Sequence, residues 1–198
     1  MVKYINEKNK KTGGGKIMGK FEECFCKPDL KLAAVCGHFC TSCTLFIGVQ
    51  EDPERLKVLA ERLHRSIDEL TCYGCRSEKK SFYCNTVCKM KKCADDRGVS
   101  FCSECTDYPC AEFKAFEAEA QDRIEVGKDL GRIKEVGYEQ WYQEMVEHYS
   151  CPKCHTINSA HDMVCRKCGA EPSCNYVKLN KQEIIQRQLA LRQKQQGQ

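Results

Sequence analysis

The chain has 198 residues, of which 41% are hydrophobic and 30% charged, so its length suits one or two domains. No apolar stretch approaches the length of a membrane span, and the N-terminus lacks the apolar centre of a secretory signal. We therefore expect a cytoplasmic protein that does not enter a membrane. In such a reducing compartment, the 18 cysteines indicate metal ligands and not disulfides.

The net charge of +4 is concentrated at the two ends of the chain. Residues 1–20 contain six lysines against one glutamate, and residues 176–198 contain five basic residues against one glutamate. The region between them is therefore mildly acidic. Basic ends on an acidic body indicate solvated tails, and nucleic-acid binding is the less favoured alternative.

The N-terminal part begins with residues 1–20, which include three consecutive glycines and are expected to form a flexible basic arm. A cysteine-rich metal-binding domain is predicted over residues 21–121. Its first two cysteines, Cys24 and Cys26, form a CxC pair. This pair suits either two additional metal ligands or two free thiols.

Eleven cysteines lie within residues 36–110, which we call the cysteine block. They are Cys36, Cys40, Cys43, Cys72, Cys75, Cys84, Cys88, Cys93, Cys102, Cys105 and Cys110. Thiolates with such short spacings converge readily on a tetrahedral Zn²⁺ ion, and the same spacings suit a [4Fe-4S] cluster. The block is therefore predicted to hold at least two metal centres of one kind or the other. Cys24, Cys26 and His38 are candidates for an extra ligand.

The clearest predicted helix lies between the first two cysteine groups. Asp52 suits its N-cap and Pro53 its first helical position. Apolar residues then recur at helical spacing, namely Leu56, Leu59, Ala60 and Leu63. Ser66 and Glu69 have capping-box spacing and predict a second, short helix.

Further helices are expected after the block. One is predicted to start at Tyr108 and Pro109, and a helical connector is predicted over residues 122–150 with a break at Gly137. An aromatic and apolar stripe along the connector is typical of a protein core. Its members at helical spacing are Trp141, Met145 and Tyr149.

Residues 151–175 contain two short cysteine motifs, Cys151-Pro-Lys-Cys154 and Cys165-Arg-Lys-Cys168. Two such knuckles, ten residues apart, resemble the short zinc-ribbon family. This resemblance implies a β-hairpin and one structural Zn²⁺ ion held by all four cysteines.

The ribbon segment departs from that family at His155, where the family usually has a glycine for the turn. The substitution adds turn strain but removes no ligand. Between the knuckles lie Asn158, His161 and Asp162, which are predicted to be exposed to solvent. Residues 176–198 are predicted to form a polar helix capped by Asn180.

The terminal helix carries apolar side chains that too little chain remains to cover. They are Ile184, Ile185, Leu189 and Leu191. An apolar edge on a terminal helix commonly docks on another protein or on a second copy of the same chain.

The cysteine block as a whole resembles a prokaryotic family of cysteine-rich proteins catalogued as a domain of unknown function. The motifs that carry the resemblance are Cys36-Gly37-x-x-Cys40-x-x-Cys43, Cys72-x-Gly74-Cys75-Arg76-Ser77, Cys84-x-x-x-Cys88-x-x-x-x-Cys93-Ala94 and Cys102-x-x-Cys105-x-x-Tyr108-Pro109-Cys110. The resemblance implies a fold but no established activity.

The sequence favours a non-catalytic role without deciding whether the protein is an enzyme. Cys36-x3-Cys40-x2-Cys43 has the spacing of radical S-adenosylmethionine enzymes, but the chain lacks the length and the strand–helix alternation of their barrel. The favoured function is a zinc-binding interaction or accessory module. The alternatives are an iron–sulfur protein, serving electron transfer or maturation of an oxygen-sensitive enzyme, and a nucleic-acid-binding ribbon protein.

The expected fold is small, metal-stapled and mainly α, with irregular cysteine-rich loops, a C-terminal β-hairpin ribbon and a terminal helix.

Overall fold

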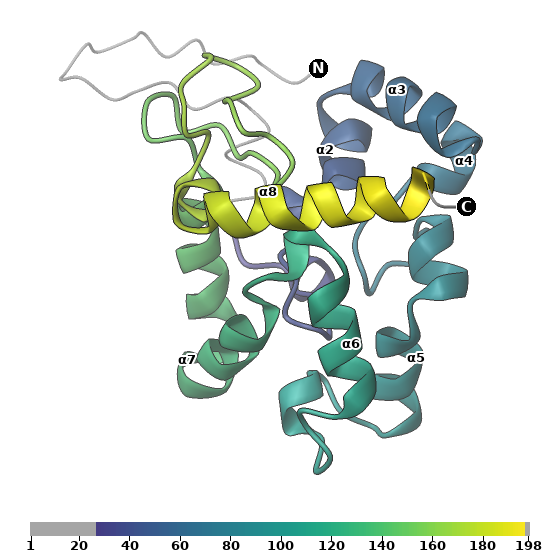
Figure 1. The fold of residues 1–198 in the computed structure, drawn as a ribbon. Helices are drawn as coiled ribbons and strands as arrows, with labels where there is room; N and C mark the ends of the chain where they lie inside the picture. Colours follow the sequence, from purple (N-terminus) through teal and green to yellow (C-terminus); the bar gives the residue numbers. More distant parts are fainter. Residues whose placement is uncertain (1–26, 197–198) are drawn as a thin grey trace, which may run out of the picture.

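The computed structural model describes residues 27–196, which fold mainly as helices (Figure 1). Within these residues no strand forms, and strand-like pairing is limited to two isolated bridges, Ala33 with Phe39 and Ser150 with Ile157. The mainly α prediction is therefore confirmed. The predicted β-hairpin of the ribbon is wrong, because residues 151–174 run as turns and irregular backbone apart from the single bridge at Ile157.

Four short helices lie within the cysteine block, namely α2 (Thr44–Gln50), α3 (Pro53–Leu63), α4 (Ile67–Leu70) and α5 (Lys89–Asp96), and α6 (Ala111–Glu119) follows it directly. Five shorter helical turns lie before, between and after them, namely η1 (Leu30–Leu32), η2 (Cys40–Ser42), η3 (Tyr83–Val87), η4 (Cys102–Glu104) and η5 (Gln121–Arg123). None of the helices within residues 27–196 is long and apolar enough to cross a membrane.

Helix α3 starts where its local sequence predicts. The Asp52 side chain accepts a hydrogen bond from the Arg55 backbone N–H, and Pro53 occupies the first turn. Three of the four stripe residues are buried, but Leu63 is 48% exposed. The buried three pack with Leu70 as a small separate core next to α2.

The main core lies against α7 (Val126–Tyr149). Trp141 and Tyr142 are fully buried, and the Phe39 ring contacts both edge-on at 6.0 and 5.0 Å between centroids. The predicted core stripe is thus confirmed. Gly137, with φ 82° and ψ 161°, interrupts the helix at the predicted position.

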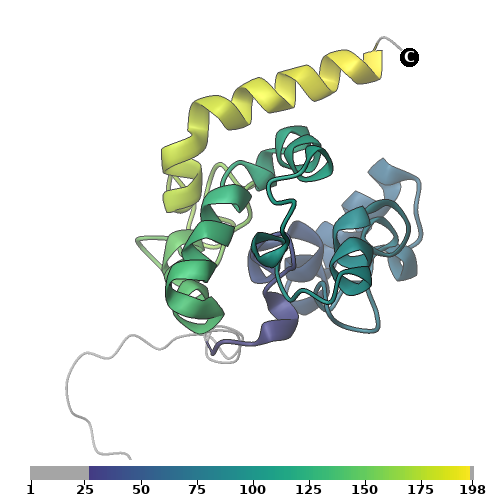
Figure 2. The ribbon, with the colours of Figure 1, turned by 90° about the horizontal axis from the view of Figure 1, so that it is seen from below.

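Helix α8 (Asn175–Gln196) runs along one edge of the molecule and begins beside α7 (Figure 2). It starts five residues before Asn180, so the predicted cap at that residue is wrong. Tyr176 and Val177 are buried, and the Tyr176 ring stacks on Tyr149 at 4.9 Å. This packing extends the helix toward its N-terminus. Ile184 is also fully buried, so the expectation that it lies uncovered is wrong, whereas Ile185, Leu189 and Leu191 are exposed.

Candidate metal centres

The two C-terminal knuckles adopt the same backbone fold. In the first, Cys151 N–H donates to the Thr156 carbonyl at 2.9 Å, and His155 N–H donates to the Cys151 carbonyl at 2.9 Å. In the second, Cys165 N–H donates to the Ala170 carbonyl at 2.8 Å, and Gly169 N–H donates to the Cys165 carbonyl at 3.0 Å. Each chain reversal therefore presents its two cysteines in the same way.

The turn position that needs a positive φ is the same in both knuckles. His155 has φ 61° and Gly169 has φ 71°. A side chain at such a φ costs backbone energy that glycine avoids. The predicted strain at His155 is therefore present, and the knuckle still closes.

The two knuckles bring Cys151, Cys154, Cys165 and Cys168 together as one group, which we call the four-sulfur site. The Cys151 and Cys168 sulfurs are 3.6 Å apart, and so are those of Cys154 and Cys165. All four lie within 4.8 Å of one another. Within residues 27–196, no other set of three or more His, Cys, Asp or Glu is as compact, so this group could hold one metal ion.

Hydrogen bonds favour thiolates in the four-sulfur site. The Lys153 backbone N–H points at Cys151 Sγ at 3.4 Å, and the Thr156 hydroxyl lies 3.4 Å from Cys154 Sγ. Burial opposes ionisation of Cys154, but the contacts with Thr156 and with neighbouring thiols outweigh it and lower the pKa of Cys154 to about 6. The site therefore ionises readily at one sulfur.

The pKa of Cys168, by contrast, is raised by its neighbouring thiols. The backbone N–H of Ala170 favours the Cys168 thiolate, but burial and the adjacent thiols raise the pKa of Cys168 to about 12. Without a cation, Cys168 therefore keeps its proton. A cation bound at the site would replace that proton, so metal binding would release it.

Asn158, which was predicted to be exposed, is fully buried at the centre of this segment. Its amide donates to the carbonyls of Thr156 and Ser173 at 2.8 and 3.2 Å and lies 3.7 Å from Cys165 Sγ. Its side-chain oxygen accepts from Arg166 N–H at 3.1 Å. These bonds tie both knuckles together and explain why the connector does not pair as strands.

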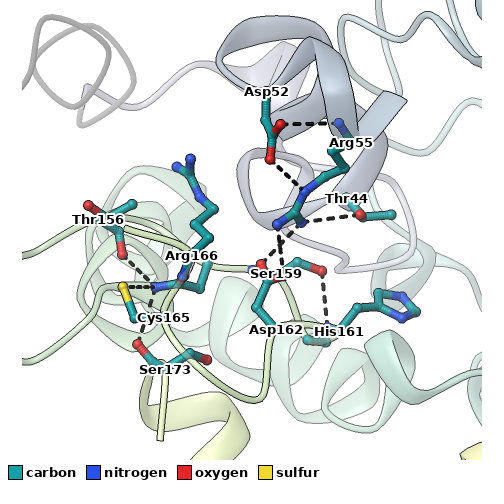
Figure 3. Close-up of polar contacts among 12 residues, drawn as sticks. Thr44, Asp52, Arg55, Thr156, Ser159, His161, Asp162, Cys165, Arg166 and Ser173 are labelled. Atoms are coloured by element: carbon teal, nitrogen blue, oxygen red, sulfur yellow. Dashed lines mark hydrogen bonds and ion pairs between the residues drawn. The ribbon is translucent and has the colours of Figure 1, made fainter. Parts of the chain in front are cut away.

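The segment is also fixed to the helical core (Figure 3). Arg55 of α3 donates to both carboxylate oxygens of Asp162, at 3.1 and 2.8 Å. Arg166 forms an ion pair with Glu51, at the end of α2. The prediction that Asp162 is exposed is therefore wrong, since its side chain is only 13% exposed, whereas His161 is exposed as predicted.

Seven cysteines of the block line one cavity of about 230 Å³, which we call the deep cysteine pocket. They are Cys36, Cys40, Cys43, Cys72, Cys75, Cys84 and Cys88. A hydrogen bond with Cys84 lowers the pKa of Cys72 to about 6, and the same bond raises the pKa of Cys84. The hydrogen bond therefore favours a thiolate at Cys72 and a protonated thiol at Cys84.

His38 also lines the deep cysteine pocket, but both ring nitrogens lie close to Asp122. Nδ1 is 3.1 Å from the Asp122 carbonyl oxygen, and Nε2 is 4.0 Å from its carboxylate. Burial lowers the pKa of the imidazole, which favours its neutral form. Both ring nitrogens of His38 thus lie next to Asp122 atoms and not next to a cysteine sulfur. Cys24 and Cys26 lie outside the described residues.

The remaining four cysteines of the block line a second cavity of about 430 Å³, which we call the outer cysteine pocket. They are Cys93, Cys102, Cys105 and Cys110. Burial raises the pKa of Cys102 to about 12, and the thiols of the other three add to this shift. The Arg97 guanidinium lies 3.1 Å from Cys105 Sγ, a neighbour that cysteine spacing alone does not identify.

Several cysteines of the block occupy helix starts. Cys43, Cys88 and Cys110 are the N-cap residues of α2, α5 and α6. Partial positive charge at a helix N-terminus favours a thiolate there. At Cys43 burial outweighs this effect and raises the pKa of the thiol to about 12.

The fold and these sites define a mainly α, cysteine-rich chain with a four-cysteine group that could hold a metal ion. Residues 32–115 match the model of a family described as "Protein of unknown function (DUF3795)". The match covers less than half of the chain, includes every cysteine of both pockets and ends before the four-sulfur site. Searches of curated proteins and of solved structures found no match.

Proposed function

We propose that this chain is a zinc-binding accessory protein that works by binding another protein and performs no turnover of its own. The observation that carries the proposal is the four-sulfur site, whose four sulfurs lie within 4.8 Å of one another. Zn–S bonds of about 2.3 Å in a tetrahedron place the sulfurs about 3.8 Å apart. The two separations of 3.6 Å are close to that value.

The donor set supports zinc and a structural role. Thiolates are soft ligands that suit Zn²⁺ and not Mg²⁺ or Ca²⁺, which prefer oxygen. Four protein thiolates complete the tetrahedron, so no position remains for a water molecule or substrate. In this proposal the ion stabilises a segment and takes no part in a reaction.

The position of the site indicates what the zinc would stabilise. The Asn158 N–H donates to the carbonyl of Tyr149, the last residue of α7, and Ser173 lies two residues before α8. Arg55 and Arg166 connect the same segment to α3 and α2. Zinc would therefore hold together the ends of four helices that are distant in sequence.

The cysteine block is proposed to bind metal in two separate centres, one in each pocket. Support comes from the division of its eleven cysteines into seven around the deep pocket and four around the outer one. A four-thiolate centre needs four of them, so both pockets have enough ligands.

The partner is proposed to bind at the outward face of α8. Ile185 and Leu189, one helical turn apart, are 42% and 51% exposed, and Leu179 is 65% exposed. Lys178 and Arg192 are exposed on the same helix. The exposed apolar side chains suit an apolar surface on the partner, and the two basic side chains suit acidic residues at the border of that surface.

The zinc content of purified variants tests the proposal. Replacement of Cys165 by Ser should remove one zinc ion per chain, because the site loses one of its four ligands. Cys174→Ser is the matched control, since Cys174 is equally buried but stands outside the four-sulfur site. Equal zinc in the Cys165→Ser and wild-type proteins would refute the assignment.

A further inference from the structure

The chain contains two different arrangements of four cysteines. In the four-sulfur site all sulfurs lie within 4.8 Å of one another. In the outer cysteine pocket four cysteines surround a cavity of about 430 Å³, and no three ligand atoms there are that close. A single tetrahedral ion needs sulfurs about 3.8 Å apart, so the outer pocket is too wide for one zinc ion.

We propose that the outer cysteine pocket binds one [4Fe-4S] cluster through Cys93, Cys102, Cys105 and Cys110. In such a cluster each thiolate binds a different iron, so the four sulfurs surround a volume and do not converge on a point. The number of cysteines in the pocket matches this requirement. The inference rests on the proposed binding of metal by the cysteine block and names the metal of one centre.

The lining of the pocket suits a cluster. Apolar side chains form much of its wall, among them Met90, Val99 and Phe113. Such a wall keeps water from the cluster, which limits loss of iron and influences the reduction potential. The N-terminus of the nine-residue helix α6 also lies here, with Cys110 as its N-cap, and favours negative charge on that sulfur.

Arg97 is the residue placed to tune the cluster. Its guanidinium lies 3.1 Å from Cys105 Sγ and 2.6 Å from a carboxylate oxygen of Asp107. The carboxylate orients the guanidinium toward the sulfur. A cation beside a cluster ligand favours the reduced form, which carries one more negative charge, so Arg97 should raise the reduction potential.

Anaerobic reconstitution of the full chain with ferric iron, a thiol reductant that converts part of it to ferrous iron, and sulfide tests the proposal. Cys93→Ser is the informative variant, because Cys93 is exposed and its replacement should leave the fold intact. It should bind about four fewer iron and about four fewer sulfide ions than the wild type. Cys174→Ser, which alters a buried cysteine outside the pocket, should bind as much of both as the wild type.

The electronic spectrum of the cluster provides a second readout. Arg97→Ala should retain the iron but show a more negative midpoint potential in a titration with dithionite, and Arg97→Lys should show a smaller shift. An unchanged potential in Arg97→Ala would overturn the tuning role.

Which metal Cys93→Ser loses distinguishes failure of the cluster proposal from failure of the proposed metal-binding function. Loss of one zinc ion with unchanged iron would overturn the cluster and leave the metal-binding function standing. No change in any metal would overturn both the cluster and the assignment of the outer pocket as a metal centre.

Discussion

Arg55 and Asp162, 107 residues apart in sequence, form a two-bonded ion pair that fixes the four-sulfur segment to α3. Both side chains are mostly buried, with 15% and 13% exposed. The same guanidinium donates to the N-cap carboxylate of Asp52. The pair therefore couples the start of a helix to the four-sulfur segment.

This pair should contribute measurably to stability. In a double-mutant cycle with Arg55→Leu and Asp162→Asn, we expect a coupling free energy of roughly 2 kcal/mol in urea unfolding, because both partners are charged and shielded from solvent. The control is the exposed pair of Lys57 with Glu54, which should give about 0.5 kcal/mol or less. Equal coupling in the two pairs would contradict the anchoring role.

Asn158 should support zinc binding without being a ligand. Asn158→Ala leaves buried carbonyls and a sulfur without their donor, so zinc affinity should fall about 10- to 100-fold. Competition with a zinc-binding dye measures that affinity. His161→Ala, an exposed change three residues away, should have wild-type affinity. Unchanged affinity in Asn158→Ala would show that the amide has no influence on the site.

Helix caps, helix breaks and turns could be predicted from the sequence where adjacent residues determine them. Asp52 caps α3, and Ser66 and Glu69 form the complete capping box of α4. Gly137 interrupts α7, and His155 adopts the positive φ of its turn. In each case the backbone conformation depends on a few adjacent residues.

Three of the failed predictions depend on contacts outside the local sequence pattern. Asn158 and Asp162 are buried because α3 and the second knuckle fold against them, which the connector alone does not reveal. Asn180 has the pattern of a helix cap, but its amide donates to Glu125 at 2.9 Å, within a helix extended by core packing. Long-range contacts override local preference in these places.

The division of the cysteine block also could not be predicted from spacing. Cys88 and Cys93 belong to one sequence group, yet Cys88 lines the deep pocket and Cys93 the outer pocket. They stand at the N-cap and in the body of α5, so the helix carries them to different cavities. Only the fold assigns each thiol to a pocket.

Asp129 should make stability fall between about pH 4 and pH 7. Burial raises the pKa of this carboxyl from 3.8 to about 7, so the folded state holds its proton more tightly than the unfolded state. The stabilisation is present below the unfolded pKa and is lost as pH rises toward the folded one.

The variant Asp129→Asn tests that dependence, because the amide is neutral at every pH. Its stability relative to the wild type, from urea unfolding, should increase by roughly 4 kcal/mol from about pH 4 to pH 7. A constant difference across this range would show that the carboxyl does not titrate there.

Substitutions on α8 test the proposed docking surface. The double variant Ile185→Asp and Leu189→Asp should keep its metal content and unfolding free energy but lose partner binding, because both side chains are exposed in the free chain. The matched control is Val58→Asp with Leu63→Asp, two exposed apolar positions on α3 and so away from α8.

Two measurements read out this comparison. Sedimentation at increasing concentration detects self-association. Capture of a purified protein whose surface is apolar with an acidic border detects hetero-association. Identical behaviour of the α8 and α3 double variants in both measurements would exclude the α8 face as a docking site.

Zinc X-ray absorption on the intact chain tests the central claim most directly, since it reports the atoms bound to the metal. The account predicts four sulfurs at about 2.3 Å around zinc, with a signal smaller by one zinc ion per chain in Cys165→Ser. Nitrogen or oxygen ligands around zinc in the wild type, or an undiminished four-sulfur signal per chain in Cys165→Ser, would contradict a zinc ion held by Cys151, Cys154, Cys165 and Cys168.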